Sequence, residues 1–89
     1  MAKTVWKSSL EHKDEQQVEM PAGAQILCVQ VQQDTPCIWA AVNPENPKEK
    51  RTILIRGTGH TALEGDLTYI GTYQTMGGMF VWHVFEKIS

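Results

Sequence analysis

Hydrophobic and polar residues alternate along most of this chain with a period of two, which is the spacing of a β-strand rather than of a helix. In the run from Gln25 to Gln32, for example, the pattern predicts that Leu27, Val29 and Val31 share one face, while the other face becomes polar towards the end. Such alternation is typical of an antiparallel strand with one face in the core. The predicted strands are Thr4 to Leu10, Val18 to Met20, Gln25 to Gln32, Cys37 to Val42, Arg51 to Arg56, Leu67 to Tyr73 and Met79 to Phe85.

The segments between these strands are short and rich in turn residues, such as Pro21-Ala22-Gly23 and the Pro- and Asn-rich stretch from Asn43 to Lys50. Thr75-Met76-Gly77-Gly78 is expected to close a hairpin. Only Glu11 to Gln17 could hold a turn of helix. The chain is therefore predicted to form one domain over residues 1–89, an all-β antiparallel sandwich or small barrel of about seven strands with little or no helix.

Composition narrows the class of protein. Of the 89 residues, 42% are hydrophobic, which is too many for a disordered chain, and no stretch approaches the roughly 18 apolar residues of a membrane span. The first residues, Met1 to Thr4, are not followed by the hydrophobic run of a signal peptide, so a cytoplasmic location is expected. The formal net charge of -2 argues against a nucleic-acid-binding protein.

Residues that could bind a metal or act as nucleophiles are few. Cys28, Cys37, His12, His60 and His83 show none of the paired spacings of a zinc site, so we predict no metal and no cofactor. The two cysteines are expected to be reduced core thiols that face each other across a hairpin. Either could pair with His83, but a thiol within an apolar strand stays protonated and inert. No catalytic residue is predicted.

The most informative stretch is the loop Arg56-Gly57-Thr58-Gly59-His60. The two glycines allow the backbone to turn sharply and approach a ligand, and backbone N–H groups in such a turn can bind an anion. Arg56 and His60 add a positive charge and a hydrogen-bonding ring, a combination suited to a phosphate or a nucleobase. The alternative is a strand end with a glycine bulge and a solvated histidine. We take these five residues as candidate ligand-binding residues.

Aromatic residues are the second candidate feature. Trp6 or Tyr73 could lie beside His60 and stack on a base, so both are added to the candidate ligand site. In the last strand, alternation places Trp82 on one face and His83 and Phe85 on the other. A strand that is apolar on both faces needs cover on both, which predicts a homo-oligomer.

Several motifs also resemble a family of short bacteriophage and prophage proteins of unknown function. They are Lys3-Thr4-Val5-Trp6-Lys7, Cys37-Ile38-Trp39-Ala40, Gly57-Thr58-Gly59-His60, Gly71-Thr72-Tyr73 and Phe80-Val81-Trp82-His83-Val84-Phe85-Glu86. The resemblance runs nearly from end to end and implies a phage protein in the cytoplasm of an infected bacterium. It brings no catalytic residues.

Together these observations lead to the hypothesis of a non-enzymatic counter-defence protein, a sponge that binds and sequesters a small nucleotide-like signalling ligand. One alternative is an inhibitor that binds a host defence protein through a sheet face or an edge strand. A hydrolase of a small signalling nucleotide would need a histidine pair or a carboxylate cluster, whereas the three histidines here are far apart in sequence. A structural role in the phage is a further alternative.

Overall fold

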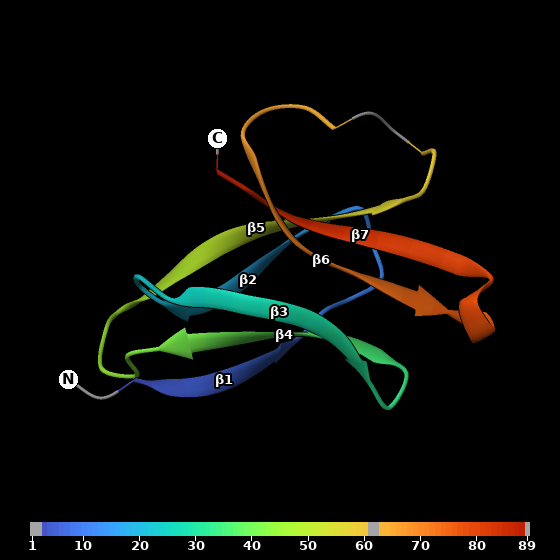
Figure 1. The fold of residues 1–89 in the computed structure, drawn as a ribbon. Helices are drawn as coiled ribbons and strands as arrows, with labels where there is room; N and C mark the ends of the chain where they lie inside the picture. The colour runs from blue at the N-terminus through green and yellow to red at the C-terminus, as the bar shows by residue number, and fades with distance from the viewer. Residues whose placement is uncertain (1–2, 61–62, 89) are drawn as a thin grey trace.

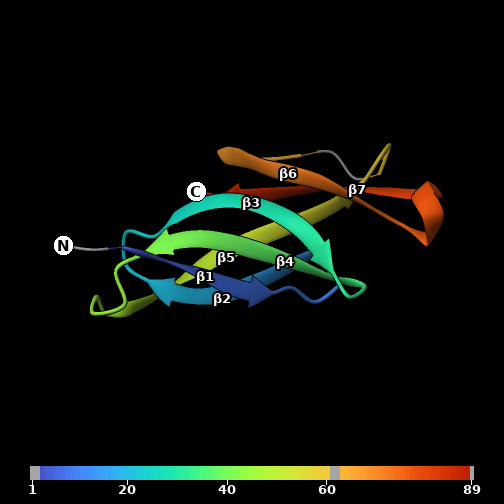
Figure 2. The same ribbon diagram turned by 60° about the horizontal axis from the view of Figure 1, so that its bottom comes forward.

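The computed structural model describes residues 3–60 and 63–88, and these form two packed antiparallel β-sheets (Figures 1 and 2). The predicted all-β sandwich is confirmed, and every predicted strand is present in it. The strands are β1 (Thr4–Ser9), β2 (Glu15–Pro21), β3 (Gln25–Gln32), β4 (Thr35–Val42), β5 (Lys48–Gly57), β6 (Leu67–Thr75) and β7 (Phe80–Lys87), with a short 3₁₀ turn, η1 (Met76–Gly78), between the last two. The possible helical turn at Glu11 to Gln17 was wrong, because β2 already begins at Glu15. Within the described residues, no helix has the length and apolar character needed to cross a membrane.

The strand order positions the later loops. One sheet has the order β1-β4-β3, and the other has the order β2-β5-β7-β6. Since β7 lies between β5 and β6, the chain must pass over β7 to connect its two neighbours. The hydrophobic core lies between the sheets and includes the fully buried side chains of Met20, Ile38, Val42, Ile53 and Val84.

A β-bulge changes the faces predicted for β3. The register shifts between Ile26, which pairs with Ala40, and Cys28, so Leu27 is the extra residue. As a result Ile26 and Val29 both pack on the core, whereas Leu27 is 49% exposed. The expected common face of Leu27 and Val29 was therefore wrong, since strict alternation holds only where no residue is inserted.

The edge strands β3 and β6 of the two sheets approach each other closely. A second register shift falls between Tyr69 and Gly71 on β6. A Cβ atom at Gly71 would lie 2.8 Å from Cγ1 of Val29, which is buried. Glycine at this position therefore allows the sandwich to close on this side.

A nearly buried ion pair between β5 and β7 also links the two sheets. Arg51 on β5 donates two hydrogen bonds to the carboxylate of Glu86 on β7, through Nε to Oε2 and through Nη2 to Oε1. Its Nη1 also donates to the carbonyl oxygen of Ala24, just before β3, at 2.9 Å. The hydrogen bonds with Glu86 raise the pKa of Arg51 above its ordinary value. Arg51 thus ties both sheets together through one guanidinium group.

Candidate functional site

The loop that follows β5 begins with a tight turn. The Thr58 N–H donates to the carbonyl of Val81 on β7 at 3.3 Å, and the His60 N–H donates to the carbonyl of Gly57 at 3.1 Å. Gly59 adopts a φ of +79°, a left-handed conformation that glycine accepts without steric cost. Two of the N–H groups of the predicted anion-binding turn are therefore already engaged in holding its shape.

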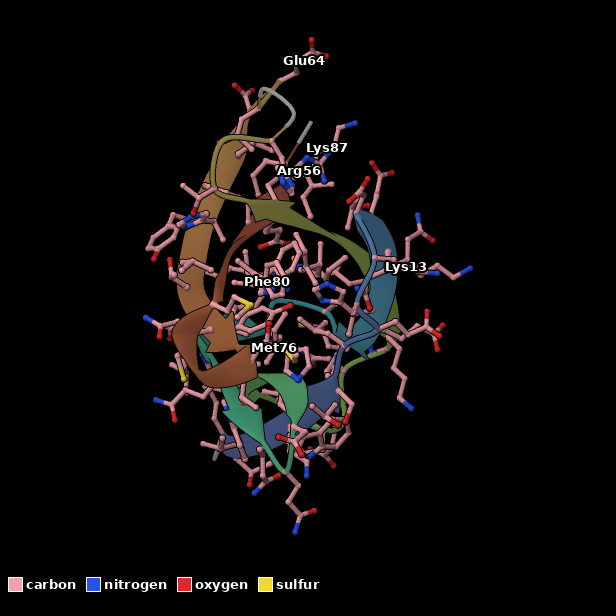
Figure 3. All side chains as sticks on the ribbon, turned by 90° about the vertical axis from the view of Figure 1, so that its right-hand side faces the viewer. Lys13, Arg56, Glu64, Met76, Phe80 and Lys87 are labelled. Atoms are coloured by element: carbon pink, nitrogen blue, oxygen red, sulfur yellow. The ribbon has the colours of Figure 1, made fainter. Side chains whose placement is uncertain are left out.

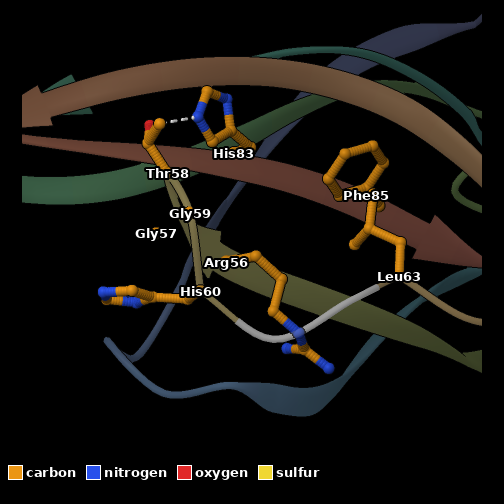
Figure 4. A pocket seen from close by; sticks show the side chains of 8 residues that line it. All are labelled: Arg56, Gly57, Thr58, Gly59, His60, Leu63, His83 and Phe85. Carbon is orange, nitrogen blue, oxygen red and sulfur yellow. Dashed lines mark hydrogen bonds between the residues drawn. The ribbon is translucent and has the colours of Figure 1, made fainter.

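The outer face of the four-stranded sheet lies next to this turn, because β5 ends at Gly57, which pairs with Trp82 on β7. Ile55 and Val84 are cross-strand partners in the core, so the next pair along, Arg56 and His83, faces outwards. The turn, Leu63 and this face line an open pocket of about 330 Å³ (Figure 4). Its lining residues are Arg56, Gly57, Thr58, Gly59, His60, Leu63, His83 and Phe85. The structure therefore brings the five predicted loop residues together with three that the sequence analysis did not assign to the ligand site, Leu63, His83 and Phe85.

His83 is held by a chain of hydroxyl groups. Its Nε2 lies 2.7 Å from Oγ1 of Thr58, and its Nδ1 lies 3.1 Å from Oγ1 of Thr72. The Tyr69 hydroxyl continues the chain to Oγ1 of Thr72. Because hydroxyl groups can donate or accept, either tautomer of the imidazole can satisfy both contacts. The ring is thus fixed in orientation against the wall of the pocket.

Arg56 supplies positive charge at the pocket. Its Nη1 donates to the backbone carbonyls of Asp14, at 2.6 Å, and of Ile55, at 3.1 Å. These acceptors are neutral, so they orient the guanidinium without cancelling its charge. Its Nε is buried and has no hydrogen-bond partner among the described residues, an arrangement that costs about 1–3 kcal/mol for a typical buried polar group.

The His60 ring lies directly beside Gly57. A Cβ atom at Gly57 would come within 2.5 Å of His60 Nδ1, so the absence of a side chain there gives the ring its place. The ring also stands edge-on to Trp82, with 6.3 Å between the two centroids. Gly57 therefore sets the position of His60.

Two predicted ligand residues do not join this pocket. Tyr73 is 4% exposed in the core, where burial raises its pKa, and its hydroxyl lies 3.2 Å from Nδ1 of His12. Trp6 lies on β1 of the other sheet, opposite Ala40. Alternation assigns a residue to a face of its own strand but does not say which sheet or which end of the fold that face meets. The His12 ring instead packs edge-on against the indole ring of Trp82, with 4.3 Å between the two ring centroids.

The cysteines lie apart from this site. Cys28 pairs with Trp39 and Cys37 pairs with Gln30, so the two thiols lie diagonally on one face. The expectation that they face each other across the hairpin was therefore wrong, because the pairing register offsets them by two residues. Both are free, and both lie in the three-stranded sheet, whereas His83 is in the four-stranded one. No group of three or more His, Cys, Asp or Glu side chains gathers in residues 3–60 and 63–88 in a way that could hold a metal ion.

The sequence contained a partial indication of the pocket residues that were not predicted, which are His83, Phe85 and Leu63. Alternation correctly placed His83 and Phe85 on one face of β7, but their proximity to Arg56 depends on β7 inserting between β5 and β6. Leu63 comes over this face from the loop and lines the pocket with Phe85. The chain thus supplies some of the cover for which a second subunit was predicted, which weakens the sequence argument for a homo-oligomer.

The comparisons with known proteins identify a family. A family model described as "Domain of unknown function (DUF7352)" matches residues 1–89, so the chain belongs to that family. No curated protein and no solved structure matches the chain. The function is therefore inferred from the site itself.

Proposed function

We propose that this family member is a non-enzymatic bacteriophage counter-defence protein that binds and sequesters a small nucleotide-like signalling ligand in the cytoplasm of its host. The observation that carries the proposal is the pocket itself, in which Arg56, the Gly57–His60 turn and His83 line one space of about 330 Å³. This volume lies within the range of roughly 300–1,000 Å³ that is typical of small-molecule sites.

The residues around the pocket suit an anionic ligand with an apolar part. Arg56 offers a guanidinium group of the kind that binds phosphate, and His60 offers a ring nitrogen. Leu63 and Phe85 form an apolar wall on the other side (Figure 4). A phosphate near Arg56 and a flat or apolar group near Phe85 would use both parts.

Binding without turnover is favoured over hydrolysis by the partners of His83. A Thr58–His83 contact has the spacing of a nucleophile and its base, but the group that orients the ring is the hydroxyl of Thr72. In hydrolases with this geometry, a buried carboxylate usually stabilises the imidazolium ion that forms. The hydroxyl chain of this protein fixes the ring and brings no negative charge.

Isothermal titration calorimetry tests the proposal. The four ribonucleoside 5′-monophosphates, their 3′,5′-cyclic forms and the cyclic dinucleotides of adenine and guanine are titrated into the protein, and each mixture is then chromatographed. We expect saturable binding of at least one nucleotide, its recovery unchanged, and a loss of affinity of at least tenfold in the double variant Arg56→Gln/His60→Ala. Lys50→Gln, an exposed charge near the start of β5, is the control and should bind normally. No binding across the panel, or equal binding by the double variant, would contradict the proposal.

A second candidate is an inhibitor that binds a host protein. The observation in its favour is the exposed apolar surface at the turn between β6 and β7, where Met76 and Met79 are 71% and 72% exposed and Phe80 is also exposed (Figure 3). Methionine and aromatic side chains are common at adaptable protein interfaces. Failure of the whole nucleotide panel, together with specific capture of a host defence complex that is lost on Met76→Ala, would favour this candidate.

A further inference from the structure

A second pocket lies beside the first and shares part of its wall. It has a volume of about 240 Å³ and is lined by Gly57, Thr58 and His60 from the turn and by residues 79–82 from the end of the β6–β7 turn and the start of β7. Figure 4 shows the His60 ring pointing away from Arg56 and Leu63, and therefore away from the first pocket's apolar wall. The turn from Gly57 to His60 thus separates two adjacent spaces.

The chemistry of the second pocket differs from that of the first. The rings of Phe80 and Trp82 lie 6.1 Å apart with an angle of 32° between their planes, and both line the space. Phe80 is 47% exposed, so its ring is accessible to a ligand. The indole N–H of Trp82 already donates to Oγ1 of Thr75 at 3.0 Å, so this ring brings its aromatic surface rather than an unsatisfied donor. The positive Arg56 lines only the first of these two pockets.

We infer that the two pockets form one bipartite site for a nucleotide, with the phosphate beside Arg56 and His83 and the nucleobase against Phe80 and Trp82. This inference rests on the proposed function and adds to it a base-binding subsite. Aromatic side chains bind bases by stacking, a contact worth about 1–3 kcal/mol per base and tolerant of base identity. The sugar would pass over the turn at Gly59, where nothing lies within 4 Å of a Cβ position.

The lining residues that the two pockets share, Gly57, Thr58 and His60, support a ligand that spans both. A side chain at Gly57 would meet the His60 ring, whereas nothing lies within 4 Å of a Cβ atom built at Gly59. The exposed ring of His60, which stands edge-on to Trp82, lines both pockets.

The test separates base binding from phosphate binding. The nucleotide 5′-monophosphate that binds most tightly is compared with ribose 5-phosphate, which has the same phosphate and sugar without the base, on wild type, Phe80→Ala and Met76→Ala. Met76 is exposed at the same turn but lines neither pocket, so its variant is the matched control. We expect ribose 5-phosphate to bind at least tenfold more weakly than the nucleotide. Phe80→Ala should weaken nucleotide binding about tenfold and leave ribose 5-phosphate unchanged, while Met76→Ala should change neither.

Each other outcome overturns the inference in a recognisable way. Equal affinities for the nucleotide and for ribose 5-phosphate would show that no base subsite exists while leaving the proposed function intact. An unchanged nucleotide affinity in Phe80→Ala would place the base elsewhere. So would an equal loss of affinity for the nucleotide and for ribose 5-phosphate in this variant. If no 5′-monophosphate binds but a cyclic dinucleotide does, the affinity for that dinucleotide is compared between the wild type and Phe80→Ala. An unchanged affinity in the variant again overturns the inference. Failure of the entire panel would instead refute the proposed function.

Discussion

Loss of Glu86 should destabilise the sandwich strongly, because it would leave the nearly buried Arg51 with only the more distant and more exposed carboxylate of Glu49, at 3.8 Å, as a counter-charge. The side chains are 17% and 11% exposed for Arg51 and Glu86, respectively, and two hydrogen bonds join them. Breaking a fully buried ion pair costs about 3–5 kcal/mol, and an exposed pair is worth at most about 1 kcal/mol. With this residual exposure, we expect Glu86→Leu to lower the free energy of unfolding by about 2–4 kcal/mol. For a domain of this size, that corresponds to a fall in Tm of roughly 10–25 °C.

The measurement is urea unfolding followed by tryptophan fluorescence, with a double-mutant cycle. Removing both charges in Arg51→Met/Glu86→Leu should recover most of the loss, since hydrophobic replacement of a buried pair is often neutral. The exposed pair Lys13–Glu11, with N–O distance 3.0 Å, is the matched control, and Glu11→Gln should cost less than about 1 kcal/mol. A cost below about 1 kcal/mol for Glu86→Leu, or a double variant no more stable than this single one, would refute the reasoning.

Three further predictions concern the loop, the core and pH. Gly57→Ala should displace the His60 ring and weaken ligand binding, as seen by calorimetry, with little change in stability, because the clash falls on an exposed side chain. Gly71→Ala should instead lower stability by about 1–3 kcal/mol in urea unfolding, because the buried β3 side chain that it meets cannot move away. Burial raises the pKa of Tyr73 above 10.0, so above about pH 10 the unfolded chain ionises there first and stability falls as the pH rises. Tyr73→Phe should reduce that fall, as measured by urea unfolding above about pH 10.

The strand pattern was accessible from the sequence because most strands pack one face on the core, so local alternation reports burial directly. It failed where the backbone departs from strict alternation. Leu27 is the clearest case, because the bulge that exposes it depends on its pairing with β4 and leaves no local mark. The end of β2 was found, but its start at Glu15 was hidden by polar residues on an exposed edge strand.

The loop portion of the candidate site was predictable because glycines beside a charged residue mark a turn that can approach a ligand. The remaining residues come from another strand. His83 reaches the pocket through its cross-strand pairing with Arg56, and no spacing in the sequence reveals that pairing. Tyr73 was misplaced because the register shift between Tyr69 and Gly71 breaks the alternation, so that Tyr73 lies in the closed core while Tyr69 is exposed on the opposite face.

Native mass spectrometry tests the central claim most directly. The protein is purified once from cells that express nucleotide-based defence systems and once from cells without them, and intact masses are compared for wild type and for the Arg56→Gln/His60→Ala variant. Sequestration predicts extra mass of nucleotide size on the wild-type protein from defence-expressing cells only, carried on a monomer or on the predicted homo-oligomer, and absent from the variant. Identical ligand-free masses from both cell types would contradict sequestration and direct the search towards a host protein as the target.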